Sequence, residues 1–134
     1  MGTFSDDLAK FEAKTSEKLD LAVRKIALEL FSRVILKSPV DTGRFRGNWQ
    51  VAIGALPNGT LELEDRTGQA TISAATARTA GVEAGDVIYL TNNLPYAQRL
   101  EEGYSQQAPA GMVALTIQEF QAIANEIGLE LVRI

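Results

Sequence analysis

The amino-acid sequence predicts a single α+β domain, in which a small antiparallel β-sheet is packed by a long N-terminal helix and a C-terminal helix. Apolar residues recur at helical spacing towards both ends of the chain and alternate with period two in its middle. The length of 134 residues and the hydrophobic share of 46% fit one domain with its own core. We therefore treat residues 1–134 as one unit.

The N-terminal helix is expected to begin after Thr3, whose spacing to Asp6 is that of a capping box. Pro39 should end it near Lys37, because proline lacks a backbone donor and disfavours a helical residue before it. Such a helix would extend roughly 50 Å, more than a compact domain of this size needs. Part of its apolar stripe is therefore a candidate contact with another chain; the stripe comprises Phe4, Leu8, Phe11, Leu19, Val23, Ile26, Leu30 and Val34.

Three runs in the middle of the chain have the pattern of strands. Residues 49–55 alternate with period two. The turn Pro57-Asn58-Gly59 leads into residues 61–64, where leucine alternates with glutamate, so these two runs predict a hairpin. Residues 87–91 have the β-branched and aromatic content of a buried strand and should join the same sheet.

The remaining segments predict mainly helices. Residues 68–85 are rich in Ala, Thr and Gly, which leaves open a flexible loop or a short helix over 71–79. Pro95 and Gly103 mark the start and the stop of a helix of about two turns. Gly128 is expected to end or kink the last helix. The stripe that predicts this helix consists of Val113, Ile117, Phe120, Ala124, Ile127 and Leu131.

The composition excludes several classes of site. With 0 Cys and 0 His, the chain has no residues for a Ser-His-Asp triad, a cysteine nucleophile, a His/Cys zinc site or a disulfide. The net charge of -4 argues against nucleic-acid binding through a broad basic surface. Neither a secretory signal nor an apolar run of membrane-spanning length is found, so we expect a soluble chain made in the cytoplasm, with no membrane partner.

Carboxylates are the acid/base candidates that remain. The neighbouring pairs are Glu62 with Glu64, Glu64 with Asp65, and Glu101 with Glu102. A magnesium site would draw on Asp41, Asp65 and Asp86, whose mutual geometry no motif fixes. Alternating acids on a strand are typical of a solvated face. We therefore predict no catalytic residue, no metal ion and no cofactor; a small metal-dependent enzyme or a nucleic-acid-binding module is the competing class.

Two segments concentrate turn formers, charged residues and aromatic side chains. The first, residues 38–49, reads SPVDTGRFRGNW and contains the one tryptophan of the chain. Its arginines, Arg44 and Arg46, can donate to carboxylates or phosphates. The second, residues 92–104, reads NNLPYAQRLEEGY. The residues alone leave two interpretations open, namely capped turns within the subunit or surfaces that bind a partner.

These segments resemble the signature stretches of the head–tail connector family of long-tailed bacteriophages, also described as neck or tail-completion proteins. The resemblance is carried by an SPVDTG corner leading to NW, an NNLPYA turn, LEEG, and APAGMV before the last helix. The motifs follow a long N-terminal helix in the order of the family and cover nearly the whole chain. Phe45 departs from the pattern, since the resemblance leads us to expect an aliphatic residue there.

The resemblance implies a structural virion protein without enzymatic activity. Its subunits would form a ring, expected to be hexameric, at the neck that joins the DNA-filled head to the tail and leaves a channel for the genome. The neighbours would be a head-completion or connector protein and a tail-terminator or tail-tube protein, while double-stranded DNA would pass without sequence-specific binding. The chain would be made in the host cytoplasm and reside in the virion. A tail-terminator-like or minor tail ring protein is the alternative.

Seven residues of the two segments are candidates for contacts between subunits or with partner proteins. We expect the arginines among them to pair with acids inside or across subunits, and segment 68–85 to order against a partner or the channel. The net negative charge would let DNA slide along the channel rather than stick. The seven candidates are Arg44, Arg46, Trp49, Asn93, Tyr96, Glu102 and Tyr104.

Overall fold

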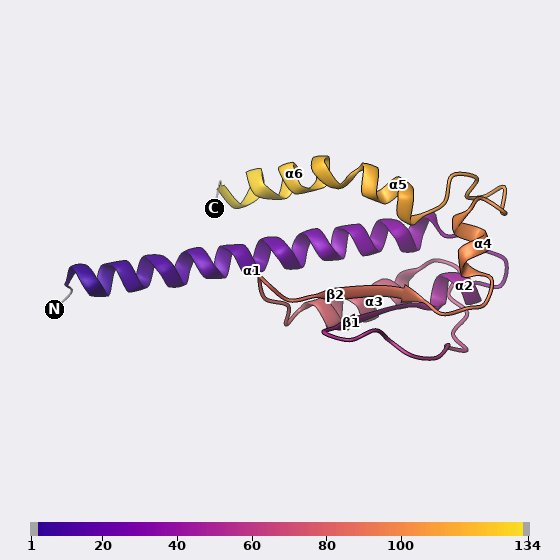
Figure 1. Ribbon diagram of the computed structural model, residues 1–134, viewed down its shortest axis with the longest axis horizontal. Helices are drawn as coiled ribbons and strands as arrows, with labels where there is room; N and C mark the ends of the chain where they lie inside the picture. The colour runs from indigo at the N-terminus through magenta and orange to yellow at the C-terminus, as the bar shows by residue number, and fades with distance from the viewer. Residues whose placement is uncertain (1–2, 133–134) are drawn as a thin grey trace.

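A computed structural model describes residues 3–132, leaving aside the side chains of residues 11–13 and 129–132, and confirms the predicted α+β class (Figure 1). The long helix α1 runs through the middle of the molecule, with α5 and α6 on one side and the sheet with α3 on the other (Figure 1). The elements in chain order are α1 (Phe4–Lys37), α2 (Arg44–Gly47), β1 (Trp49–Ile53), α3 (Gln69–Thr79), β2 (Ile88–Asn92), α4 (Ala97–Glu101), α5 (Val113–Gln118) and α6 (Phe120–Val132).

Helix α1 begins with the predicted capping box. The Thr3 hydroxyl accepts a hydrogen bond from the Asp6 N–H at 3.2 Å, and the Asp6 carboxylate accepts one from the Thr3 N–H at 3.2 Å. The helix ends at Lys37, because Ser38, which precedes Pro39, is extended with ψ at 137°. The N-terminal part of this 34-residue helix projects beyond every other element (Figure 1).

The sheet has two antiparallel strands, with Trp49 of β1 opposite Asn92 of β2. β1 ends at Ile53, earlier than predicted, where Gly54 adopts a φ of 83°. β2 confirms the strand predicted over 87–91, displaced along the chain by a single residue. The strands that pair are therefore far apart in the sequence.

The hairpin predicted around the turn at 57–59 is wrong, because residues 61–64 do not pair with β1. The fully buried Asn48 side chain binds both backbone groups of Leu61, donating to its carbonyl at 2.9 Å and accepting from its N–H at 2.7 Å. The Asp65 N–H then donates to the Gly43 carbonyl at 2.9 Å. These bonds hold the segment beside α2 instead of in the sheet.

Helix α3 corrects the prediction of a flexible loop over 68–85 and supports the helical alternative. The Asp65 carboxylate stabilises the first turn, accepting hydrogen bonds from the Thr71 N–H at 2.8 Å, the Thr71 hydroxyl at 2.7 Å and the Gly68 N–H at 3.0 Å. The small residues that suggested mobility instead permit close packing. Ala75 is buried, and α3 contacts both α1 and β1.

The single C-terminal helix predicted from the apolar stripe is two helices, α5 and α6, with a break at Glu119. The Glu119 carboxylate is held against α1, where it accepts hydrogen bonds from Lys37 and, at 2.7 Å, from Arg33. The hydrogen bond from Lys37 lowers the pKa of Glu119, and that from Arg33 adds to it. Gly128 does not end α6, which continues to Val132.

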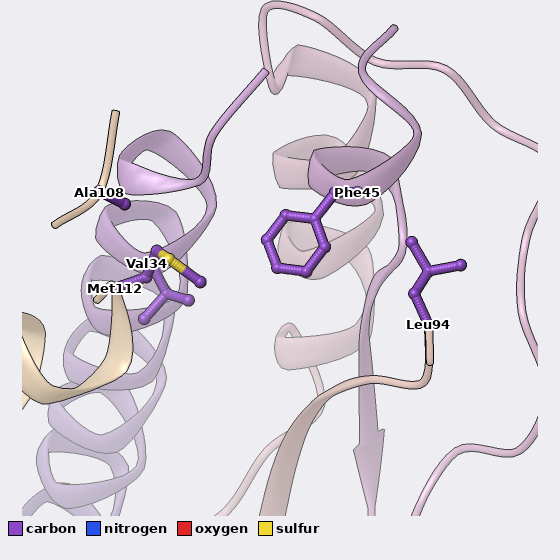
Figure 2. Packing of buried hydrophobic residues seen from close by; sticks show 5 residues of the cluster. All are labelled: Val34, Phe45, Leu94, Ala108 and Met112. Atoms are coloured by element: carbon purple, nitrogen blue, oxygen red, sulfur yellow. The ribbon is translucent and has the colours of Figure 1, made fainter. Parts of the chain in front are cut away.

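Two hydrophobic clusters join the layers. Ile123 and Ile127 of α6 are buried against the face of α1 that carries Ile26 and Leu30. At the other end of the molecule, Figure 2 shows Phe45 of α2 pointing towards Val34 and Met112. The buried members of this second cluster are Val34, Phe45, Leu94, Ala108 and Met112. Within residues 3–132, none of the helices has the length and hydropathy of a membrane-spanning segment.

Candidate functional site

A cleft of about 370 Å³ lies where the 39–45 corner meets α4 and the segment after it. We name it the corner cleft; it occupies the end of the molecule that carries α2 and α4 (Figure 1). The short helix predicted between Pro95 and Gly103 is confirmed as α4 and forms one wall. The cleft is lined by Pro39, Val40, Asp41, Thr42, Gly43, Arg44, Phe45, Tyr96, Leu100, Tyr104, Ser105 and Gln107.

The corner depends on Gly43, whose φ is 94°. A Cβ at this position would lie 2.6 Å from the Arg66 nitrogen and 2.7 Å from the Asp65 carbonyl carbon. No side chain fits there, because the neighbouring backbone cannot move away without breaking the hydrogen bond from Asp65 to the Gly43 carbonyl. Because Gly43 has no side chain, the backbone of segment 61–66 can pack directly against the corner.

Gln107 fastens the opposite wall to the corner. Its side-chain amide donates to the Val40 carbonyl at 3.0 Å and accepts from the Val40 N–H at 2.8 Å, as a neighbouring strand would. Sequence reasoning missed Gln107, and an isolated glutamine in a turn carries no local signal that could have found it. The two walls of the corner cleft come from segments more than 50 residues apart in the sequence.

Aromatic side chains lie on both walls of the cleft. The ring of Phe45 lies 6.1 Å from the ring of Tyr96 and, in an edge-on arrangement, 5.8 Å from that of Trp49. Tyr104 is 73% exposed, and the Arg99 guanidinium lies 5.3 Å from its ring centroid. Phe45 thus lies between the half-buried Trp49 and the exposed Tyr96.

Arg44 is the cationic group of the corner cleft. Its side chain is 41% exposed, and its ion pair among the described residues is a loose one of 3.8 Å to Glu62, whose side chain is 95% exposed. The buried Nε has no hydrogen-bond partner in the described part of the chain. The terminal nitrogens of the half-exposed guanidinium, engaged only in this loose ion pair among the described residues, can therefore donate to an acceptor, such as a carboxylate, that enters the cleft.

Arg46 acts inside the subunit and binds carbonyls, not acids. It donates to the carbonyls of Leu36 at 3.0 Å, Ser38 at 2.9 Å and Arg66 at 2.6 Å. Burial lowers the pKa of Arg46, and the charge of Asp65 opposes that shift. Arg46 thus joins the carboxyl end of α1 to the segment that precedes α3.

The other sequence candidates divide between the interior and the surface. Trp49 donates from its indole Nε1 to the Ser38 hydroxyl at 2.7 Å. Asn93 donates to the carbonyls of Pro57 and Gly59, each at 3.0 Å, and so holds the loop after β1. Glu102 is exposed and accepts only a hydrogen bond of 3.2 Å from Gln98 among the described residues. The corner cleft therefore collects Arg44, Tyr96 and Tyr104 of the seven candidates.

Glu101 accepts more hydrogen bonds than its neighbour Glu102, the residue chosen as a candidate from the sequence. Its carboxylate accepts hydrogen bonds from the N–H groups of Met112 at 2.9 Å, Val113 at 2.9 Å and Ala114 at 3.0 Å. Burial raises the pKa of Glu101, but these three bonds outweigh it and lower the pKa overall. Glu101 thus caps the first turn of α5 and fixes α4 to it.

The acids considered for catalysis or metal binding do not converge. Burial disfavours the charged form of Asp65, yet hydrogen bonds from Thr71, Gly68 and Thr67 outweigh it, so the pKa of Asp65 is lowered. Its oxygens are occupied in capping α3. Among residues 3–132 with described side chains, no group of three or more acidic side chains is placed to hold a metal ion.

The arrangement offers the Arg44 guanidinium beside the rings of Phe45, Tyr96 and Tyr104, on walls held by hydrogen bonds to the backbone. Such a surface can bind a peptide segment whose carboxylates pair with the guanidinium and whose apolar side chains contact the rings. Comparison with protein-family models, with curated proteins and with solved structures finds no match for this chain.

Proposed function

We propose that this chain is a structural virion protein of a tailed bacteriophage, which forms a ring at the head–tail neck and leaves a channel for the genome. The observation that carries the proposal is that the two stretches of the family resemblance, far apart in the sequence, line one cleft. Residues 39–45 supply one wall, and Tyr96, Tyr104 and Gln107 supply the other. A signature that served only local turns would not need to converge in this way.

The corner cleft is the proposed contact with a neighbouring subunit or with an adjoining neck protein. Arginine and tyrosine are enriched in protein interfaces, because each combines a broad contact area with directed hydrogen bonds. Arg44 and Tyr104 are exposed in the cleft, while the corner beneath them is held by hydrogen bonds between Asp65 and Gly43 and between Gln107 and Val40. A base held by such bonds loses less conformational entropy on association.

The charge of the chain suits a subunit beside a DNA path. At a net charge of -4, a ring of such subunits would on balance repel the phosphate backbone, so the genome could move through without being retained. The proposed partners are a head-completion or connector protein on one side and a tail-terminator or tail-tube protein on the other. The chain would be made in the host cytoplasm and become part of the virion.

The proposal is tested by deleting the gene from the phage or prophage that encodes it and imaging the lysate by electron microscopy. We expect genome-filled heads beside separate, complete tails. Overlong tails would instead favour the tail-terminator alternative. Normal infectious particles would contradict both, and a metal-dependence assay of the acidic residues would then be the next experiment.

Complementation of the deletion separates the corner cleft from the fold. Wild-type protein and Arg78→Ala, which changes an exposed arginine of α3 outside the cleft, should restore joined particles. Arg44→Ala combined with Tyr104→Ala should fail to restore them while the purified variant keeps the wild-type helix content. Full rescue by this double variant would remove the cleft from the proposed interface.

A further inference from the structure

The N-terminal part of α1 exposes the large apolar side chains that are described in it. We name residues 4–19 the α1 arm; it projects beyond the ends of α6 and the sheet (Figure 1). Its apolar side chains are exposed to a degree unusual for their type, at 81% for Phe4, 46% for Leu8 and 55% for Leu19. These residues belong to the same stripe that α6 covers further along α1.

A groove in the body of the protein is apolar and also uncovered. It is formed by two adjoining hollows of about 370 Å³ and 170 Å³, which share Leu30 and Phe31 of α1. On its rim, Ile117 is 65% exposed and Phe120 is 45% exposed. We name it the α1 groove; its other apolar lining residues are Val23, Ile26, Ala27, Val34, Ile88, Leu90 and Val113.

The arm cannot occupy the groove of its own subunit. Both belong to the continuous helix α1, and the arm points away from the body along the helix axis (Figure 1). Every copy of the chain thus presents one arm and one groove, in equal numbers. A second copy of this chain is the occupant that satisfies both surfaces at once.

The lengths of the two surfaces are compatible. The groove follows α1 from Val23 to Val34, about 17 Å at 1.5 Å per residue, and the arm from Phe4 to Leu19 is about 23 Å long. The arm exposes acids such as Asp6 and Glu17 as well as lysines such as Lys18, so its apolar stripe is the part that complements the groove. An amphipathic helix in an apolar groove, anchored at three- and four-residue steps, is a common mode of protein recognition.

We infer that the α1 arm of one copy docks in the α1 groove of the next. The contact is heterologous, since arm and groove are different surfaces, and it generates a closed ring when the rotation between copies closes. The inference rests on the proposed ring and specifies the contact between its subunits. It buries the exposed stripe that a soluble monomer would leave in water.

Two single substitutions test the contact from its two sides. Leu8→Glu places a charge on the arm, and Ile117→Glu places one on the rim of the groove; both sites are exposed, so the subunit should keep its helix content. Leu56→Glu changes a residue that is 61% exposed but belongs to neither surface, and it serves as the matched control. The assembly state is measured by sedimentation velocity at about 0.1 mM, where even a micromolar contact is nearly saturated.

We expect the wild type and the Leu56→Glu control to form the same closed oligomer, and each of the other two variants to be monomeric. Mixing the two defective variants is the decisive step, because the intact arm of Ile117→Glu can enter the intact groove of Leu8→Glu. The mixture should give a one-to-one heterodimer and no larger species.

Other outcomes overturn the inference. A wild type that is monomeric, oligomers that survive both substitutions, or a mixture that stays monomeric would each exclude the arm-in-groove contact. None of these results contradicts the neck function, which is decided by the deletion phenotype. Conversely, the predicted heterodimer together with normal deletion particles would retain the contact and reject the neck function.

Discussion

The indole of Trp49 donates a hydrogen bond to the hydroxyl of Ser38 at 2.7 Å, and that hydroxyl donates in turn to the Val34 carbonyl at 2.9 Å. Ser38 is the first residue after α1 and Trp49 is the first residue of β1. The two bonds therefore fix the start of the sheet to the end of the long helix, with the 39–45 corner between them. The corner cleft depends on this connection for its shape.

Ser38→Ala should lower the free energy of unfolding by about 1 to 3 kcal/mol, because it leaves the Trp49 N–H without its acceptor in a partly buried place. The measurement is urea denaturation followed by tryptophan fluorescence. Ser73→Ala, at an exposed position of α3, should change the free energy by no more than about 0.5 kcal/mol. Equal effects of the two substitutions would show that the hydrogen bond does not contribute.

Arg46→Ala and Arg44→Ala should differ sharply in stability although the residues are near neighbours. Loss of Arg46 removes the donors to three carbonyls and should lower the free energy of unfolding by roughly 2 kcal/mol or more. Loss of Arg44, whose partner Glu62 is exposed, should cost less than about 1 kcal/mol. Urea denaturation of both variants measures these free energies. A larger loss of stability for Arg44→Ala than for Arg46→Ala would contradict the structural role assigned to Arg46.

Gly43→Ala should destabilise the protein far more than Gly59→Ala. Both glycines have positive φ, at 94° and 75°, but a Cβ at Gly43 meets backbone atoms within 2.7 Å and one at Gly59 meets nothing within 4 Å. The left-handed conformation alone should cost the Gly59 variant about 1 kcal/mol, and steric overlap should cost the Gly43 variant about 2 kcal/mol beyond that. Similar melting temperatures for the two variants would contradict the packing described for the corner.

Stability should decrease as the pH falls below about 4.5, because Asp65 and Glu101 have lower pKa values in the folded chain than their ordinary values of 3.8 and 4.5. Between the folded and the ordinary pKa of each group, the unfolded chain binds more protons than the folded one. The stabilisation is complete above the ordinary values and is lost as the pH falls through the folded ones. Urea denaturation from pH 7 to pH 3 measures the slope.

Glu101→Gln tests whether the Glu101 carboxylate contributes to this change of stability with pH. The variant should be less stable than the wild type at pH 7, and the difference should shrink as the pH falls below 4.5, because the unfolded wild-type chain then takes up a proton at Glu101 more readily than the folded chain. Glu102→Gln, at the exposed neighbouring position, should leave the pH profile unchanged. A constant difference for Glu101→Gln across this range would mean that the charge of Glu101 does not contribute.

Local patterns were sufficient for the elements whose signals lie in neighbouring residues. The capping pair Thr3 and Asp6, the stop at Pro39 and the strand from Trp49 are all confirmed. The predicted hairpin failed because the partner of Leu61 is a side chain, Asn48, and not another backbone strand. Alternation of leucine and glutamate indicates one buried and one exposed face, but it does not say which group takes the backbone bonds.

The residues of the candidate site divide in the same way, into those that the sequence pattern indicated and those whose role depends on distant parts of the chain. Arg44, Tyr96 and Tyr104 were found because charged and aromatic residues beside turns are conspicuous in a sequence. Arg46 resembles Arg44 in sequence, and only the positions of the carbonyls around it separate a structural role from an exposed one. Glu101 was missed in favour of Glu102, since the helix that it caps begins more than ten residues later.

Locating the protein in the mature particle tests the neck proposal most directly. A hexahistidine tag supplies the only histidines of this chain, which has 0 His of its own, and nanogold bound to it can be imaged on purified virions by cryo-electron microscopy, with untagged virions as the control. The account predicts gold at the junction of head and tail on joined, infectious particles. Gold along the tail, at the tail tip or on the capsid surface, or virions without the chain, would contradict it.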